Sequence, residues 1–475
     1  MTISAKPRTT EKLLALIRDG KPMSLNQKFR LTALLSAPSI LAHLSAIAMQ
    51  YIDASMVGSL GAEASASIGL VSTTTWLFWG LLSAAATGFS VQVAHKVGAS
   101  DFDAARRILR QSVPLVLLFS ISLAAIGIGI SGLLPSWLGA DTSIHADASR
   151  YFLIFSLFLP ALQLNFLGGS MLRCAGNMKV PSMLNILMCV LDVILNFFLI
   201  FPSRELSIAG LHIPIPGAGM GVEGAALATV LAETIVATAM IWYLFFRSPL
   251  KSEQKSRSWF AIDRQTVARA LHIGMPVGLE HLAICGAQIL VTAIVAPLGV
   301  IAIAANAFAI IAESLCYMPG YGIAEAATTL GGQSIGAGRH SLTKSFGIIT
   351  VGSGMIVMAA LGVVLYIYAP EIISVMSPVE EIRLLGADIL RIEAWAEPMF
   401  AAAIVAYGFF IGLGRTILPS AMNLISIWGV RLTLAAWLAP TMGLRGVWLA
   451  MCIELTFRGL IFLILLAVYC LRKKH

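Results

Sequence analysis

One carboxylate near the end of the first long apolar run is well placed to bind an ion. Asp53 lies in the stretch AMQYIDASMVG, and no Lys or Arg falls within twenty residues of it on either side. An ionised acid at bilayer depth costs about 2.5–3.5 kcal/mol to insert, so such acids face the interior of a helix bundle and usually serve function. The Asp53 carboxylate can bind a proton, or a sodium ion together with other oxygen ligands. The alternative is a solvated acid at a helix end near Gly58.

A second polar group follows with helical spacing. Asn185, Cys189, Asp192 and Asn196 are separated by four, three and four residues, which places them on one face of a helix. A polar face on an otherwise apolar helix is expected to point into the protein. We therefore expect Asp192 and Asn196 to share a proton or a sodium ion with Asp53.

Other polar residues of the apolar runs are candidates for substrate binding or secondary coupling. Glu280 and His281 are adjacent and suit substrate or proton handling, with helix packing as the alternative for the histidine. Glu313 is expected deep in a later run, where it can balance the charge of a cationic substrate, and Gln50 is a further candidate. Glu325, twelve residues after Glu313, is expected at the solvated cytoplasmic end of that run.

The segments that carry these residues are typical of a membrane protein. Of the 475 residues, 58% are hydrophobic and 12% are charged, whereas soluble domains are about one-quarter charged. Runs of about 20 apolar residues can cross a bilayer as helices, and the segments between them are too short for an enzyme domain. The runs are too long and too evenly apolar for barrel strands. Twelve runs lie at about 31–52, 64–94, 112–134, 149–171, 181–201, 223–246, 270–296, 302–332, 346–368, 388–413, 419–440 and 446–471.

The distribution of charge predicts the orientation of the chain. The net charge of +8 comes mainly from segments that share one side of the membrane if both termini are cytoplasmic. This asymmetry follows the positive-inside rule and predicts contact with anionic lipid headgroups in the cytoplasmic (inner) membrane rather than with nucleic acid. The opposite side then holds Arg150, Arg204, Arg383 and Arg445.

The sequence contains an internal repeat. A shift of 238 residues aligns Pro38 with Pro276, Gly98 with Gly336, Pro181 with Pro419, and Asn185 with Asn423. Towards the end of each half the offset falls to 222, because an extra outer loop near 203–218 lengthens the first half. A constant register over so long a stretch indicates two homologous halves.

Six helices per half predict parallel repeats related by an axis along the membrane normal, with a substrate cavity between them that opens alternately to each side. The fold class predicted is therefore an all-α membrane protein of twelve transmembrane helices in two six-helix repeats. The expected segments are a cytoplasmic leader 1–30, a first bundle 31–246, a cytoplasmic linker 247–269, a second bundle 270–471 and a basic tail 472–475.

Several motifs that recur in this register resemble those of the multidrug and toxic compound extrusion (MATE) family. They are IDASMVGSLG after the first run, HKVGASDFDAARR and GQSIGAGRHS at equivalent places in the two halves, LRCAGNMKVP, and GVEGAALATVLAE. The resemblance covers about residues 30–470. It implies a twelve-helix antiporter that expels organic, often cationic, compounds in exchange for sodium ions or protons, without any other cofactor and as a monomer.

The resemblance also implies roles for particular residues. Asp53 matches the family's first-helix aspartate, and Thr229 matches a helix-6 hydroxyl that serves the coupling site in some branches, although a hydroxyl bonded to its own helix is the alternative. The family often has Asn-x3-Asp in helix 5, whereas this chain has the reverse order, Asp192 then Asn196. The second half lacks the family's helix-7 glutamate at its usual place, so coupling is expected in the first half.

Two other classes of function fit the sequence less well. A flippase or exporter of a lipid-linked or specialised metabolite would need a basic cavity for its phosphate groups, and few arginines, such as Arg431 and Arg458, fall within the runs. An intramembrane enzyme is disfavoured because no Gly-x-Gly-Asp, His-Glu-x-x-His or Gly-x-Ser-x-Gly motif occurs in a suitable context.

Overall fold

The computed structural model describes residues 9–208, 211–251 and 262–472. The first half of the chain forms the N-terminal bundle. Its helices are α1 (Thr9–Arg18), α2 (Leu25–Gly58), α3 (Ala62–Gly98), α4 (Phe102–Ile130), α5 (Leu134–Trp137), α6 (Thr142–Leu157), α7 (Leu159–Cys174), α8 (Lys179–Leu199) and α9 (Gly221–Phe246). Strands β1 (Pro202–Ile208) and β2 (Leu211–Ala218) pair antiparallel between α8 and α9.

The second half forms the C-terminal bundle. Its elements are α10 (Arg264–Val295), the short η1 (Ala296–Leu298), α11 (Val300–Gly336), α12 (His340–Met376), α13 (Glu380–Ala394), α14 (Glu397–Gly412), α15 (Ile417–Ile425), the π-helical segment η2 (Ser426–Leu432), α16 (Thr433–Met442) and α17 (Leu444–Leu471).

The described chain contains up to twelve segments that could span a membrane, in agreement with the predicted number. Ten helical segments are long and apolar enough to cross a bilayer, and two bent pairs complete the number. The pair α6–α7 bends by 51° and the pair α13–α14 by 57°, where the sequence predicted two unbroken spans. Pro160 and Pro398 lie in the first turns of α7 and α14. Proline lacks the backbone N–H that would continue the preceding helix, so both halves bend at the same point of the repeat.

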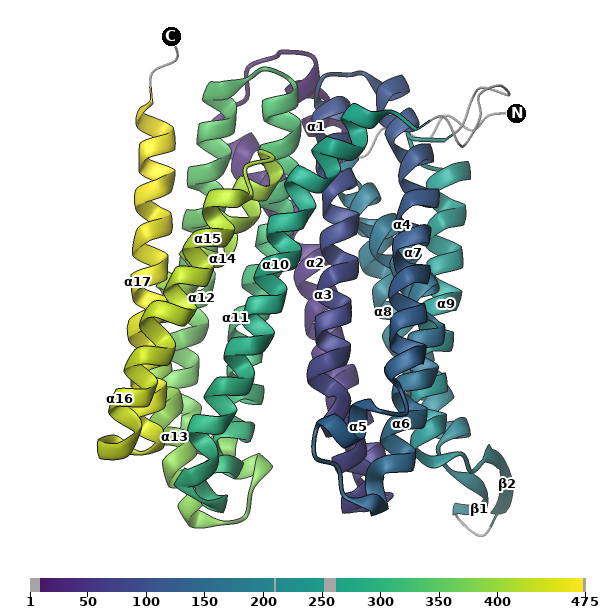
Figure 1. Ribbon diagram of the computed structural model, residues 1–475. Helices are drawn as coiled ribbons and strands as arrows, with labels where there is room; N and C mark the ends of the chain where they lie inside the picture. The colour runs from purple at the N-terminus through teal and green to yellow at the C-terminus, as the bar shows by residue number, and fades with distance from the viewer. Residues whose placement is uncertain (1–8, 209–210, 252–261, 473–475) are drawn as a thin grey trace.

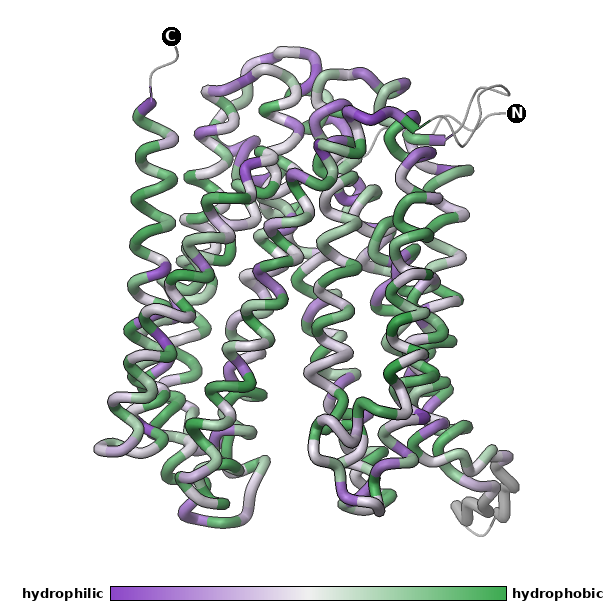
Figure 2. The backbone as a smooth tube through the Cα atoms, viewed as in Figure 1, coloured by the Kyte–Doolittle hydropathy of each residue, from purple (hydrophilic) through white to green (hydrophobic). Residues whose placement is uncertain are grey.

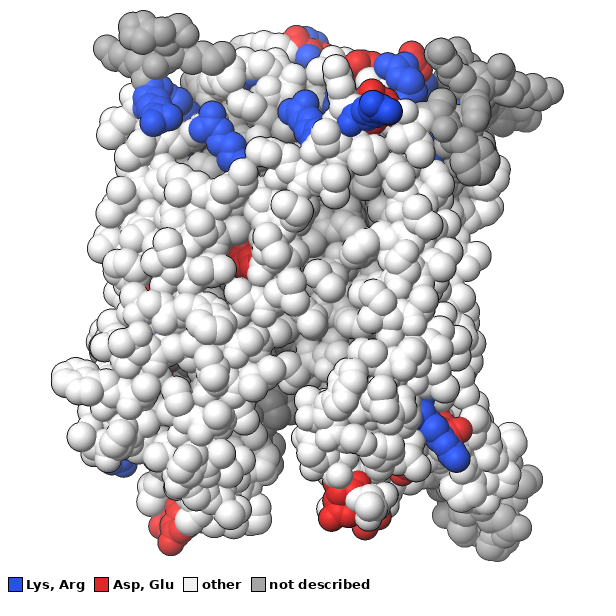
Figure 3. Space-filling model, viewed as in Figure 1, with Lys and Arg blue, Asp and Glu red and all other residues white. Residues whose placement is uncertain are grey.

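The two bundles lie side by side and meet more closely at one end than at the other (Figure 1). The end where α1 lies and α17 finishes is called the terminal end, and the opposite end, which carries β1 and β2, is called the hairpin end. Helices α2 and α3 of the N-terminal bundle pack against α11 and α10 of the C-terminal bundle. The α3–α10 contact is tight, because a Cβ atom on Gly88 would lie 2.4 Å from the carbonyl oxygen of Ala270. Towards the hairpin end the bundles separate and leave a notch (Figure 3).

Two segments differ from the sequence prediction. The expected leader 1–30 includes helix α1, whose Leu13 and Ile17 are buried against residues of both bundles, and α2 already begins at Leu25. The Arg339 guanidinium donates a hydrogen bond to the carbonyl oxygen of Leu16 at 2.8 Å. The expected outer loop near 203–218 is a β-hairpin.

Charge and hydropathy follow the long axis of the molecule. Apolar residues dominate the middle of the bundles and hydrophilic residues gather near both ends (Figure 2). On the face shown in Figure 3, Lys and Arg form a band at the terminal end, and acidic residues mark the tips of both bundles at the hairpin end. This separation is the one that the positive-inside rule describes.

Candidate functional site

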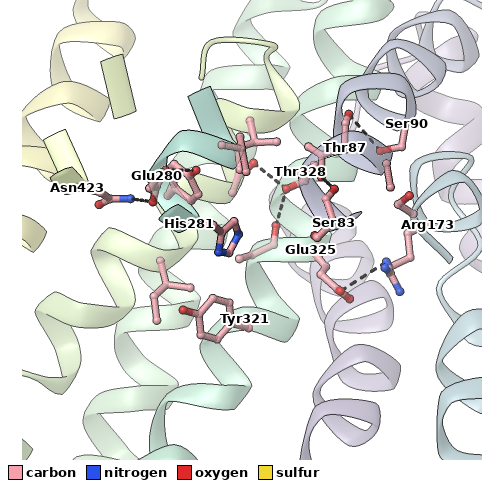
Figure 4. Close-up of a pocket in the computed structure, with 18 of the residues that line it drawn as sticks. Ser83, Thr87, Ser90, Arg173, Glu280, His281, Tyr321, Glu325, Thr328 and Asn423 are labelled. Carbon is pink, nitrogen blue, oxygen red and sulfur yellow. Dashed lines mark hydrogen bonds and ion pairs between the residues drawn. The ribbon is translucent and has the colours of Figure 1, made fainter. Parts of the chain in front are cut away.

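A cavity of about 310 Å³ lies between the two bundles. Both bundles contribute to its wall, and the wall combines acids, hydroxyl groups and aromatic rings (Figure 4). The polar residues labelled there are Ser83, Thr87, Ser90, Arg173, Glu280, His281, Tyr321, Glu325, Thr328 and Asn423. Pockets that hold small molecules usually combine an apolar lining with a few placed polar groups.

Glu280 is the acid at the C-terminal side of this cavity. Its side chain is largely buried, and its Oε1 accepts a hydrogen bond from Asn423 Nδ2 of α15 at 2.7 Å. Its Oε2 accepts a hydrogen bond from the Tyr407 hydroxyl of α14, which also lies 3.2 Å from Ser420 Oγ. Three neutral groups thus hold the carboxylate in place. Asn423 and Tyr407 were not among the predicted site residues, because one polar residue on an apolar helix gives no periodic signal.

His281 and Tyr321 complete the wall next to Glu280. His281 lines the cavity and packs directly over α3, since a Cβ atom on Gly80 would lie 2.6 Å from His281 Cγ. Tyr321 stacks edge-on with Tyr317 at 6.0 Å between ring centroids. Aromatic faces of this kind attract cations and suit flat organic molecules.

Glu325 is not at a solvated helix end, so that prediction was wrong. It lines the cavity, and its Oε1 lies 3.5 Å from Arg173 Nε of α7 and 3.6 Å from His43 Nε2 of α2. Glu325 belongs to the C-terminal bundle and its two partners to the N-terminal bundle, so the ion pair joins the bundles across the cavity (Figure 4). Sequence reasoning missed it because the partners are about 150 residues apart.

A second polar site lies inside the N-terminal bundle, where the structure brings Asp53, Asp192 and Asn196 together. Asn196 Nδ2 donates hydrogen bonds to Asp53 Oδ1 at 2.8 Å and to Asp192 Oδ2 at 3.0 Å. Asp192 and Asn196 are each 1% exposed. The reversed order of the helix-5 pair therefore still yields one amide that bridges two carboxyl groups from α2 and α8. The Thr229 hydroxyl donates to the carbonyl oxygen of Ala225 on its own helix at 3.2 Å and lies beside Asp192.

The oxygen atoms of this site fit a sodium ion or a proton. Asp192 Oδ1 and Asn196 Oδ1 are buried and have no hydrogen-bond partner. Carboxylate and amide oxygens are the ligands that hard cations prefer, and a proton shared between the two carboxyl groups would remove one of their negative charges. Towards the hairpin end the site is covered by an apolar cluster that includes Val57, Ile200 and Val222.

The structure places two other candidates away from the cavity. Gln50 is exposed on α2, and Glu313 is buried inside the C-terminal bundle near Glu393 and Glu397, at the bend between α13 and α14. Glu313 was expected to face a cationic substrate. Its side chain points into its own bundle instead, because that position of α11 packs against the broken span rather than against the N-terminal bundle.

One charged group in the C-terminal bundle was not predicted. Glu454 of α17 is fully buried and forms ion pairs with Arg431 Nη2 at 2.8 Å and with Arg458 Nε at 3.0 Å. The Ser426 hydroxyl donates to the same carboxylate at 2.6 Å. Glu454 and Arg458 are four residues apart, a spacing that could have indicated the pair from sequence. Arg458 also lines the central cavity.

The chain is similar to known proteins over most of its length. A family model described as MatE matches residues 38–198 and 276–437. A probable multidrug resistance protein NorM of Thermotoga maritima is 24% identical over 86% of this chain and 85% of its own length. A probable multidrug resistance protein NorM of Chromobacterium violaceum is 23% identical over 93% of this chain and 94% of its own. A structure described as the outward-facing conformation of a multidrug resistance MATE family transporter superposes with a TM-score of 0.85 at 19% identity, covering 97% of this chain and 98% of that one.

Proposed function

Because the chain belongs to the MatE family of membrane transporters, we propose that it exports amphipathic organic cations by alternating access, in exchange for sodium ions or protons. The protein moves its substrate and does not transform it. No cofactor other than the coupling ion is part of this proposal. The relatives described as multidrug resistance proteins support export of foreign compounds.

The observation that carries the proposal is the cavity between the bundles with Glu280 in its wall. Glu280 is 6% exposed and is held by an amide and a phenol, neither of which carries a positive charge. A cationic substrate in the cavity would therefore meet a carboxylate in surroundings of low dielectric constant, where attraction between charges is strong. Tyr321, His281 and Phe400 offer ring faces beside it for the apolar part of the substrate.

The Asp53–Asp192–Asn196 site is proposed as the coupling site. A sodium ion or a proton bound there would neutralise buried carboxyl charge, and a sodium ion could also take the two unpartnered oxygens as ligands. The three residues join α2 to α8, so occupancy of the site would change how α2 sits in the N-terminal bundle. Helix α2 also packs against α11 of the C-terminal bundle, which links the coupling site to the cavity wall.

The charge distribution supports one orientation in the membrane. We propose that the terminal end faces the cytoplasm, that the protein spans the inner membrane as a monomer, and that its basic band contacts anionic headgroups. The bundles are packed together at the terminal end and separated at the hairpin end (Figures 1 and 3). The cavity in this arrangement would therefore be reached from outside the cell.

The alternative, export of a phosphate-bearing lipid-linked or specialised metabolite, is favoured by one observation, since Arg173 and Arg458 line the cavity. Both guanidinium groups are already paired with acids, Arg173 with Glu325 and Arg458 with Glu454. Glu280 has no such ion pair with a basic side chain in the described part of the chain. Arg458 shares Glu454 with Arg431, so the acids and arginines of this wall balance in number. Among the described residues, Glu280 is the acid of the wall that no direct ion pair engages, which favours a cation beside it.

The proposal is tested by transport of ethidium in proteoliposomes under an imposed sodium or pH gradient. Wild type is expected to move ethidium under at least one gradient. Asp53→Asn is expected to bind ethidium but to lose gradient-driven transport. Glu223→Gln is the matched control, because Glu223 pairs with Arg150 at the hairpin end, away from both sites. If neither gradient moves ethidium in the wild type, cation export by antiport is wrong.

A further inference from the structure

A second cavity, of about 190 Å³, lies within the N-terminal bundle and contains an acid that the proposed function does not use. The acid is Glu233 of α9, which is 4% exposed. Helices α2, α7, α8 and α9 form most of the wall. The polar residues of the wall are His43, Asn165, Arg173, Ser182, Asn185, Cys189, Glu233 and Glu325.

The cavity lies on the terminal-end side of the coupling site. Helix α8 runs towards the hairpin end, and the cavity residues Asn185 and Cys189 precede Asp192 on it. Helix α9 runs the opposite way, and Glu233 follows Thr229 by one turn, a rise of about 6 Å. Both helices therefore place the cavity one or two turns closer to the terminal end than the coupling site.

The atoms in this cavity suit a cation. Glu233 Oε2 accepts a hydrogen bond from Asn165 Nδ2 at 2.5 Å, and no Lys or Arg forms an ion pair with Glu233 in the described part of the chain. Asn165 Oδ1 is buried without a hydrogen-bond partner. A carboxylate and an unpartnered amide oxygen thus line the same cavity, next to the Asn185 side chain. Hard cations take such oxygen ligands, and a proton on Glu233 could be donated to the free amide oxygen.

The cavity lies between the two sites already described. Cys189, on its wall, lies three residues before Asp192 on the same face of α8. At its other end, His43, Phe166, Arg173 and Glu325 line both this cavity and the central one. Glu233 therefore lies between Asp192 and the ion pair that joins the bundles.

We propose that Glu233 and Asn165 form a relay site for the coupling cation, a sodium ion or a proton. The relay would join the Asp53–Asp192–Asn196 site to the part of the central cavity that Arg173 and Glu325 line. The inference rests on the proposed function and assigns a further site to it. When the terminal end opens, a cation at Glu233 would lie next to the widened cavity and could leave to the cytoplasm.

The fold itself does not require an acid at this position. The residue 222 positions later in the second half is Leu455, which is 1% exposed and apolar. Burying a carboxylate without a basic partner costs free energy that a leucine would avoid. The presence of a buried acid where the packing does not require one is consistent with a role in moving charge.

The test compares wild type, Glu233→Gln, Glu233→Asp, Glu223→Gln and Asp53→Asn in proteoliposomes. Ethidium transport is measured under a sodium gradient at equal pH and, separately, under a pH gradient without sodium, so that the two arms identify the cation. Binding of ethidium is measured in detergent. Glutamine can keep the hydrogen bond from Asn165, which limits damage to the fold, and Glu223→Gln controls for loss of an acid from the same helix.

For Glu233→Gln, we expect ethidium binding close to that of the wild type, but a rate of gradient-driven transport that falls roughly 10- to 100-fold, the usual cost of removing a group that supports cation binding. Glu233→Asp should regain part of the rate with a changed dependence on the driving cation. The relay is overturned if Glu233→Gln keeps the wild-type rate and cation dependence, or if it loses ethidium binding as well and Glu233→Asp regains nothing. If neither gradient drives ethidium transport by the wild type, or if Asp53→Asn transports ethidium at the wild-type rate, the proposed function itself is wrong.

Discussion

His95 of α3 and Gln333 of α11 form equivalent hydrogen bonds across the interface between the bundles. His95 Nε2 lies 2.8 Å from the carbonyl oxygen of Gly412, and Gln333 Nε2 donates to the carbonyl oxygen of Cys174 at 2.8 Å. Donors and acceptors are both 238 residues apart, so each bond is the repeat counterpart of the other. A carbonyl oxygen only accepts, so His95 carries its proton on Nε2.

Two glycines allow the backbones of α3 and α11 to come close together beside these hydrogen bonds. A Cβ atom on Gly98 would lie 2.0 Å from the carbonyl oxygen of Gln333, and a Cβ atom on Gly336 would lie 2.1 Å from that of His95. These positions are also 238 residues apart. The terminal end is therefore closed by one motif used twice, and alternating access requires both copies to separate.

Replacing either of these glycines should favour opening at the terminal end. Gly98→Ala places a methyl group against a backbone carbonyl, and overpacking of this kind costs about 1–3 kcal/mol, which would shift a two-state population by roughly 5- to 150-fold. Hydrogen–deuterium exchange of the segment 88–98 should rise. Gly352→Ala on α12, where a Cβ atom would meet nothing within 4 Å, should leave that exchange unchanged. Equal exchange in both variants would contradict the role of the close approach.

Removing the two hydrogen bonds should have similar and additive effects. Each bond contributes about 1 kcal/mol, so His95→Ala and Gln333→Ala should each raise exchange at the terminal end by about fivefold and together by about 25-fold. The bonds share no partner, and a departure of the double variant from about 25-fold measures the coupling between them. The measurement is the exchange rate of the amides in segments 88–98 and 329–336. A large effect from one variant and none from the other would show that the copies are not equivalent.

The sequence allowed much of the fold to be predicted. Hydropathy placed twelve spans and the register of 238 residues revealed the repeat, because both properties extend over long segments. The bends after Leu157 and Ala394 were missed, since the apolar composition continues through Pro160 and Pro398. The packing of helix α1 against both bundles was not predicted, because its apolar face is short and becomes buried only when both bundles are present.

The sites were predictable where spacing along one helix carried the signal. Asp192 and Asn196 share a helical face, and the structure places both beside Asp53. Glu325 was misplaced because its position along a helix says nothing of Arg173, which comes from a helix of the other half. Glu233 was overlooked within a family motif, since a single acid has no period and its partner Asn165 lies 68 residues away.

Replacing Glu280 should weaken binding of cations selectively. Glu280→Gln keeps the size of the side chain but removes its charge, and a bond that involves a charged group contributes about 1.5–3 kcal/mol. The dissociation constant for ethidium should therefore rise roughly 10- to 150-fold. Binding of an uncharged aromatic compound of similar size should change little. Titration of both ligands by fluorescence checks the prediction, and an equal loss for both would indicate that the cavity had collapsed.

The ion pair between Arg173 and Glu325 should respond to exchange of its charges. Arg173→Glu would place two acids together across the interface, with only His43 left to offset them. Both side chains are partly exposed, at 18% and 27%, so water screens the repulsion and the effect on transport should be moderate, about fivefold in rate. The double variant with Arg173→Glu and Glu325→Arg restores opposite charges and should regain most of that loss in the ethidium assay. If the double variant is slower than either single variant, the pair does not join the bundles through its charge, and Glu325 would act on the substrate or the coupling cation directly.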